Sequence, residues 1–252
     1  MKKILGLLTA LLMMFALSAC GGDSAKGSVK VGEKASTKLT EKNFFEVLSK
    51  TQSDAGSAFM TMNMSAMGQD MTIEASVEMG KTLEEIAMDM TMGMGEEKFQ
   101  IIMLDGFMYM NMGKMSDNKY IKIDSSDPES PIAGDFEEMA EQMDPASQLK
   151  RIEEATVSLK SLGDGGKVDG VSTTKWEVTV DPSKLDVEEA EAAALPETLT
   201  YLMWVGEDNL PRKQSFEAMG TTTEILYTKW GQDFKIKAPS ADQVTEDVDG
   251  LM

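Results

Sequence analysis

Hydrophobic and polar residues alternate through most of residues 57–123, which is the pattern of β-strands that bury one face. Methionine dominates the apolar positions, because 15 of the 23 methionines lie between residues 60 and 115. Short turn sequences such as Asp105-Gly106 separate the alternating runs, so the pattern predicts an antiparallel meander. The six predicted strands are 58–67, 70–79, 84–94, a segment around 99–103, 107–112 and a segment around 121–123.

Three segments have helical rather than strand periodicity: 40–52, 134–155 and 181–194. In the first, Phe44, Val47 and Leu48 form one apolar stripe, and Thr40 is the predicted N-cap. Asp-Pro pairs at 144–145 and 181–182 are typical of helix starts. The helices predicted at 40–52 and 134–155 are the available cover for one face of the sheet.

The second half of the chain predicts further strands. An alternating run at 156–162 precedes the Gly-rich stretch 163–170, which we interpret as a turn. The later strands are predicted within 171–180, 197–208, 210–219 and 221–230. The sum is an α+β fold: one curved antiparallel sheet, an open half-barrel, with helices packed against its concave apolar face.

The N-terminal residues carry a targeting signal. Residues 1–19 combine two lysines, an apolar run and small residues, the pattern of a secretory signal peptide. Leu17-Ser18-Ala19-Cys20 resembles the bacterial lipobox, which implies a diacylglyceryl group on Cys20 and cleavage just before it. We therefore expect a lipidated N-terminus and flexible tether at 20–38, a binding domain at 39–240 and a frayed acidic tail at 241–252.

Composition excludes several classes of function. The formal net charge of −19 disfavours a nucleic-acid partner, because phosphate binding needs clustered Lys and Arg. The chain has no histidine and one cysteine, so Ser-His-Asp and Cys-His catalytic groups cannot form. No P-loop or calcium-loop spacing occurs. We expect no enzyme activity, no metal and no cofactor, although spacing alone leaves a Ser-Lys dyad open.

Three stretches of the second half carry a family resemblance: "KVDGVSTTKWEVTVD", "LPETLTYLMWVGEDNLPRK" and "TEILYTKWGQDFKIKAPSADQV". Together with "YIKID" at 120–124 and the lipobox, their order resembles the actinobacterial LppX/LprA/LprF/LprG lipoprotein family over roughly residues 38–244. The resemblance implies a LolA-like half-barrel that binds acylated lipids or glycolipids in a hydrophobic cavity and carries them across the cell envelope. The family cavity is usually lined by Leu, Val, Ile and Phe, whereas this chain uses Met.

The resemblance and the strand pattern together predict which residues line the cavity. They are Met60, Met62, Met64, Met71, Ile73, Val77, Ile86, Met88, Met90, Met92, Phe99, Ile101, Met103, Met108, Met110, Ile121 and Val178. The expected partners are an acyl lipid or glycolipid and the membrane that holds the Cys20 anchor, with a membrane transporter as a further candidate. The expected protein is a monomer on the extracytoplasmic face of the cell membrane.

Two other interpretations of the methionines stay open. Met on alternate strand positions is compatible with plain core packing. Thioethers also suit Cu(I), but residues two apart on one strand are about 6.6–6.8 Å apart, which is long for a shared metal. A copper cluster across neighbouring strands, about 4.8 Å apart, is geometrically easier. A Met-rich Cu(I)-binding envelope lipoprotein is therefore the alternative function.

Overall fold

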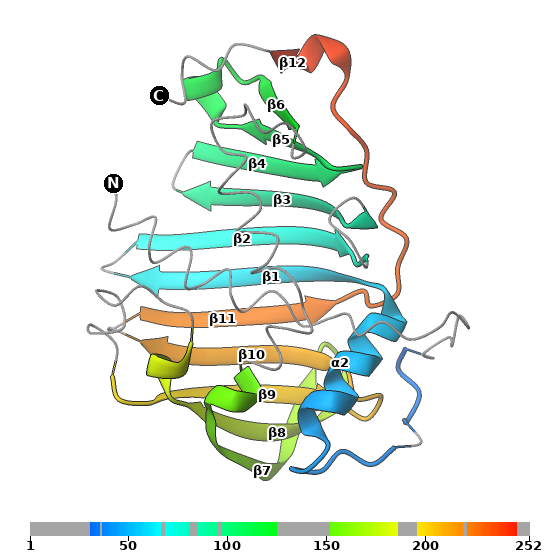
Figure 1. Ribbon diagram of the computed structural model, residues 1–252, viewed down its shortest axis with the longest axis vertical. Helices are drawn as coiled ribbons and strands as arrows, with labels where there is room; N and C mark the ends of the chain where they lie inside the picture. Colours follow the sequence, from blue (N-terminus) through cyan, green and yellow to red (C-terminus); the bar gives the residue numbers. More distant parts are fainter. Residues whose placement is uncertain are drawn as a thin grey trace.

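The computed structural model describes residues 31–35, 37–66, 69–80, 85–94, 97–124, 152–185, 196–218 and 221–245 (Figure 1). The helical elements are α2 (Phe44–Ala55) and the short 3-10 helices η2 (Gly113–Ser116), η3 (Pro182–Lys184) and η4 (Ala241–Gln243). The strands are β1 (Ser57–Ala66), β2 (Gln69–Glu78), β3 (Ala87–Met94), β4 (Glu97–Leu104), β5 (Phe107–Asn111), β6 (Tyr120–Asp124), β7 (Thr156–Val168), β8 (Val171–Val180), β9 (Leu199–Gly206), β10 (Pro211–Ala218), β11 (Thr221–Thr228) and β12 (Val244–Thr245).

The described strands form one unclosed sheet in the order β12-β6-β5-β4-β3-β2-β1-β11-β10-β9-β8-β7. Every neighbouring pair is antiparallel except β12–β6, which is parallel. The two meanders, β1–β6 and β7–β11, join where β11 pairs with β1. The predicted α+β open half-barrel is confirmed, and the six strands predicted for residues 57–123 are all present.

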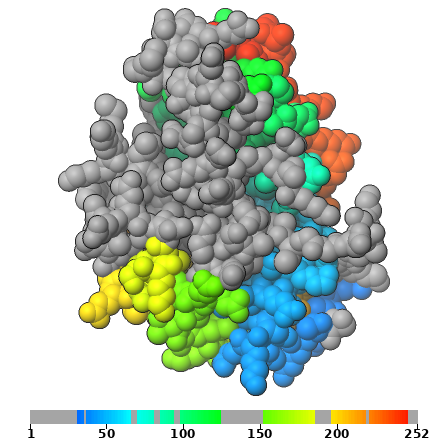
Figure 2. All heavy atoms as spheres, in the orientation of Figure 1, coloured from blue at the N-terminus to red at the C-terminus, as the bar shows by residue number. Residues whose placement is uncertain are grey.

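One face of the sheet, which we call the inner face, is the face on which α2 packs (Figure 1). Phe44 and Leu48 of α2 are buried among side chains of β8 and β9, and the Phe44 and Trp176 rings lie 4.9 Å apart. Residues 152–155 are helical and place the buried Ala155 in the same cluster. Figure 2 shows α2 directly against this second segment. The two helical segments therefore cover the β7–β9 end of the inner face.

The opposite, outer face is largely polar but has one small apolar cluster. Ile102, Tyr109 and Tyr120 pack there beneath Ile236 and Val244 of the C-terminal segment. β12 extends the sheet by pairing with β6. Residues 241–245 were predicted to lie in a frayed tail, and that boundary is wrong, because they form η4 and β12. The C-terminal segment is held in place because it covers the apolar side chains of Ile102, Tyr109 and Tyr120.

Several local predictions need correction. The helix predicted from Thr40 begins at Phe44, because Asn43 is its N-cap residue and accepts hydrogen bonds from the Thr40 backbone N–H and hydroxyl. The predicted helix from Asp181 is interrupted: η3 spans three residues and Leu185 is extended. The remainder of that helix, and most of the one predicted at 134–155, lie outside the described residues.

The Gly-rich stretch 163–170 was interpreted as a turn, and the chain does reverse within it, but only at its last two residues. β7 continues to Val168 and absorbs the glycines in register shifts at Ser161/Gly163 and Asp164/Gly166. The reversal occurs at Asp169-Gly170, where both residues have positive φ, 49° and 77°, as a two-residue hairpin turn requires. Bulges tolerate glycine with positive φ, so glycine alone did not distinguish a bulge from a turn.

Candidate functional site

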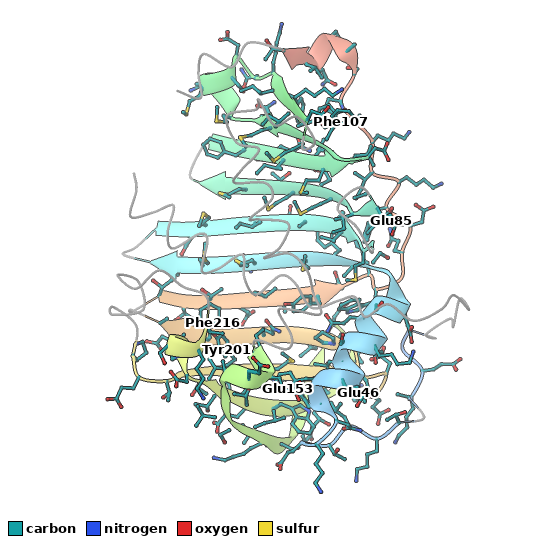
Figure 3. All side chains as sticks on the ribbon, in the orientation of Figure 1. Glu46, Glu85, Phe107, Glu153, Tyr201 and Phe216 are labelled. Carbon is teal, nitrogen blue, oxygen red and sulfur yellow. The ribbon has the colours of Figure 1, made fainter. Side chains whose placement is uncertain are left out.

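The inner face is continuous across the sheet. In an antiparallel pair, directly opposite residues project to the same face. Met62 is opposite Ile225 of β11 on one side and Ile73 of β2 on the other. The row continues from Ile73 to Met92 and then to Phe99. Figure 3 shows sulfur atoms distributed across β1–β5 on this sheet. The period-two pattern in the sequence therefore becomes one broad apolar surface.

Each predicted lining residue except Ile86 lies on a strand at an inner-face position. Ile86 is half-buried and precedes β3, which begins at Ala87, so its predicted place in that strand is wrong. The buried members are Met60, Met62, Met64, Ile73, Met90, Met103, Met108, Ile121 and Val178. The half-buried members on strands are Met71, Val77, Met88, Met92, Phe99, Ile101 and Met110. The face thus combines filled core with apolar side chains that retain exposed area.

Most of the predicted lining residues, all except Ile86 and Phe99, divide among three clusters. The β1–β3 members pack with Ile225 and Tyr227 of β11. Met103, Met108 and Ile121 form a second cluster, against which Met88, Met110 and Met112 pack. Val178 belongs to the third cluster, beneath α2. Five methionines therefore meet at the β3–β6 end, and Met is suited to this position because its flexible, polarizable side chain adapts to irregular neighbours.

The β8–β11 half of the inner face contains functional candidates that the sequence reasoning missed. Tyr201 and Phe216 lie on neighbouring strands with ring centroids 5.4 Å apart (Figure 3). Gln214, Thr223 and Tyr227 are buried on this half. The alternation Thr223, Ile225, Tyr227 along β11 was the available signal. It places two hydroxyl groups beside the methionines of β1.

Three buried polar atoms on this half have no hydrogen-bond partner among the described residues: Trp176 Nε1, Thr223 Oγ1 and Tyr227 Oη. Burial raises the pKa of Tyr201 to about 12 and raises the pKa of Tyr227 as well, because desolvation disfavours the phenolate. Both phenols therefore stay neutral at physiological pH. An unpaired buried polar group is costly, so these atoms mark places where a ligand group is favoured.

A buried ion pair fixes the β9–β10 turn. The Arg212 guanidinium contacts the Asp208 carboxylate, and their side chains are 4% and 1% exposed. Asp208 also accepts hydrogen bonds from the Leu210 N–H at 3.2 Å and from the Gly32 N–H at 2.8 Å. Gly206 fits closely against this carboxylate, because a Cβ there would lie 2.6 Å from Asp208 Oδ1. The carboxylate therefore ties an N-terminal segment to the turn.

The predicted flexible tether is shorter than expected as a result. The Ala35 N–H donates to Glu207 O at 2.8 Å, and the Asn209 side chain donates to Thr37 O at 2.9 Å. The described residues of 31–38 are therefore attached to the β9–β10 turn. These contacts begin before residue 38, so the predicted boundary of the tether is wrong. Backbone groups, rather than apolar side chains, make most of the contacts, and backbone groups leave no hydrophobic pattern in the sequence.

Two features are absent from the part of the chain that the structure describes. No group of three or more His, Cys, Asp or Glu side chains in those ranges is placed to hold a metal ion. None of the helices described there has both the length and the apolar character needed to cross a membrane.

Comparisons with known proteins agree with this architecture. No family model and no curated protein sequence matches the chain. Among solved structures, the lipoprotein LppX of Mycobacterium tuberculosis matches with a TM-score of 0.53 at 12% identity, over 79% of this chain and 100% of LppX. LprF of Mycobacterium bovis matches with a TM-score of 0.55 at 12% identity, over 80% of this chain and 99% of LprF. The fold is that of LppX and LprF.

The LppX-like fold confirms the structural part of the resemblance found in the sequence. The match spans nearly the whole of both solved chains and 79–80% of this chain, so the likeness extends well beyond a shared hairpin. At 12% identity it establishes the fold, and the chemistry of the inner face has to be argued from this chain's own residues.

Proposed function

We propose that this protein is a cell-envelope lipoprotein of the LppX type that binds the acyl chains of a lipid or glycolipid on its inner face and carries that lipid across the envelope. The observation that supports this best is the set of half-buried apolar side chains that each of the strands β2–β5 contributes to the inner face beside the filled core. Binding and release of a lipid need no catalytic group.

The energetics of such a site favour acyl chains. Each methylene removed from water contributes about 0.8 kcal/mol, and apolar area contributes about 25 cal/mol per Å² before ordering costs. Met71, Met88 and Met110 each keep part of their surface exposed on the inner face. Methionine has three rotatable bonds, so these side chains can follow chains of different length and branching without a fixed complementary shape.

Attachment to the membrane is assigned to Cys20. The lipobox resemblance places an acylated cysteine there, and two or more acyl chains are enough for stable anchoring. The ordered N-terminal segment reaches the β9–β10 turn at Gly32. Residues 20–31 then give a reach of roughly 40 Å when extended, at about 3.3–3.6 Å per residue. The anchor therefore holds the domain near the membrane surface.

One experiment tests anchor and cargo together. The unsubstituted chain is expected to take up radiolabelled palmitate and to fractionate with the membrane, whereas the full-length Cys20→Ala chain is expected to take up no label. Native mass spectrometry of the purified Cys20→Ala chain should show co-purifying lipid that organic extraction removes. Equal palmitate label on the unsubstituted and the Cys20→Ala chains contradicts the anchor. A chain that is always empty and binds no added acyl lipid contradicts the cargo.

Copper binding is kept as a second candidate because Met88, Met103 and Met108 are direct cross-strand partners within the five-methionine cluster. Exchanging Met103 and Met110 for Leu removes two thioethers but conserves volume and apolar area. For a lipid site we expect acyl-lipid affinity to change by less than about 3-fold. Stoichiometric Cu(I) uptake by the unsubstituted chain, lost in Met103→Leu/Met110→Leu, is the result that supports copper instead. Both affinities are measured on the same preparations.

A further inference from the structure

The inner face has two chemically different halves. On β1–β6, the buried inner-face positions described by the structure carry Met, Ile or Ala side chains. On β8–β11, the inner face also carries the buried Trp176, Gln214, Thr223 and Tyr227. The boundary lies at the β1–β11 pair, where Thr223 is opposite Met64 and Tyr227 is opposite Met60. We call the four β8–β11 residues the polar subsite.

Strand register determines the dimensions of the polar subsite. Thr223 and Tyr227 are four residues apart on β11, so they are separated by roughly 13 Å. Gln214 is opposite Ile225, which lies midway between them. Trp176 lies three strands from β11 in the same row, through Met203 and Gln214, or roughly 14 Å away. The subsite is therefore a patch rather than a point, with Gln214 at its centre.

The polar subsite has unused hydrogen-bonding capacity. Trp176 Nε1, Thr223 Oγ1 and Tyr227 Oη are fully buried and have no partner among the described residues. Trp offers one donor, whereas Thr and Tyr each offer a donor and an acceptor. Burying such groups unpaired destabilises the ligand-free protein, and a ligand that pairs them recovers that free energy. The arrangement therefore favours a ligand with several hydroxyl or carbonyl oxygens.

The charge on this half selects among such ligands. The polar subsite itself is uncharged, and the nearby Arg212 is already paired with Asp208 and with two backbone carbonyls. No free cation is thus supplied by the described residues of the subsite, and the whole chain carries a net charge of −19. A phosphate or carboxylate buried there would lack a counter-charge, which costs several kcal/mol.

We propose that the polar subsite binds the uncharged polar part of a lipid, its sugar hydroxyls and ester carbonyls, while the acyl chains lie over the methionines of β1–β5. This inference rests on the proposed lipid-binding function. It adds the chemical class of the lipid and the orientation in which the lipid lies on the inner face. A neutral glycolipid fits both halves, and an anionic phospholipid fits only the apolar half.

The test uses three probes on the full-length Cys20→Ala chain. They are monogalactosyl diacylglycerol, phosphatidylglycerol with the same acyl chains, and the hydrocarbon diphenylhexatriene, which fluoresces in apolar surroundings. Thr223→Val and Tyr227→Phe remove the two hydroxyl groups with little change of shape. Each is expected to weaken galactolipid binding by about 3- to 10-fold, the usual size of one lost hydrogen bond. Diphenylhexatriene binding should be unchanged, and the ligand-free melting temperature should be unchanged or higher.

Matched controls separate this inference from the proposed function. Thr222→Val alters the adjacent, exposed residue on the other face and should leave all three affinities unchanged. Galactolipid affinity that is unaffected by Thr223→Val and Tyr227→Phe, or phosphatidylglycerol binding as tight as galactolipid binding, overturns the polar subsite alone. Failure of the unsubstituted chain to bind diphenylhexatriene or either lipid overturns the proposed function.

Discussion

Asp208→Ala is expected to lower the free energy of unfolding by about 3–5 kcal/mol, because it leaves the Arg212 guanidinium buried without a counter-charge. The same change removes the acceptor for the Gly32 and Leu210 backbone N–H groups. Urea denaturation of the Cys20→Ala chain at pH 7, followed by circular dichroism, measures the loss.

A double substitution provides the control for this prediction. Replacing both charged groups, in Asp208→Ala/Arg212→Met, removes the unpaired charge and should be less destabilising than Asp208→Ala alone. Asp208→Asn keeps a carbonyl acceptor for the backbone donors but loses the charge, so an intermediate effect is expected. A cost below about 1 kcal/mol for Asp208→Ala, or a double variant no better than the single one, contradicts the role assigned to the pair.

The β9–β10 turn also shows why parts of the structure could not be predicted from the sequence. "GEDNLP" is a recognisable turn sequence, but nothing local indicates that its Asp208 is buried or that it binds Gly32, 176 residues away. The pairing of β11 with β1 is equally non-local and joins the two meanders into one sheet. Alternation predicts that a strand has an apolar face, whereas the partner of each strand depends on the whole fold.

Alternation was reliable where every second residue was apolar. It placed Met60, Met62 and Met64 on one face of β1, and the register with β2 and β11 confirms that placement. It was less informative on β10 and β11, where Gln214 and Thr223 occupy inner-face positions. A polar residue at such a position looks like an interruption of the pattern. In the structure these residues are buried, which is why the polar subsite could not be proposed from the sequence.

The number of methionines in the sequence does not show which of them are neighbours. Only the strand register shows this. Met88, Met103 and Met108 are far from periodic along the chain, yet they are successive cross-strand neighbours on β3, β4 and β5. The feature that matters for acyl-chain binding is the half-buried set, because those side chains retain exposed apolar area on the inner face.

Met71→Asp is expected to weaken acyl-lipid binding by at least about 100-fold. Met71 is half-buried on the inner face, where it packs against the β1–β3 cluster. A carboxylate there has to be desolvated without a partner when an acyl chain covers it, at a cost of several kcal/mol. Since 1.4 kcal/mol is tenfold in affinity, a cost near 3 kcal/mol is enough. Aspartate is also too short to extend its charge back into water, as lysine does.

A substitution at the adjacent residue, Thr72, provides the control for Met71→Asp. Thr72 is exposed on the outer face of the same strand, so Thr72→Asp introduces the same charge one position away without touching the proposed binding surface. It should leave diphenylhexatriene and galactolipid affinity within about 2-fold, and Met71→Leu should do the same because it restores apolar area of similar volume. Circular dichroism establishes that all three variants fold. If folded Met71→Asp binds as tightly as Thr72→Asp, the acyl chains do not cover this part of the face and the inner face is filled core. If only Met71→Asp loses binding, the alternation seen in the sequence separates the lipid-binding face from the solvated one.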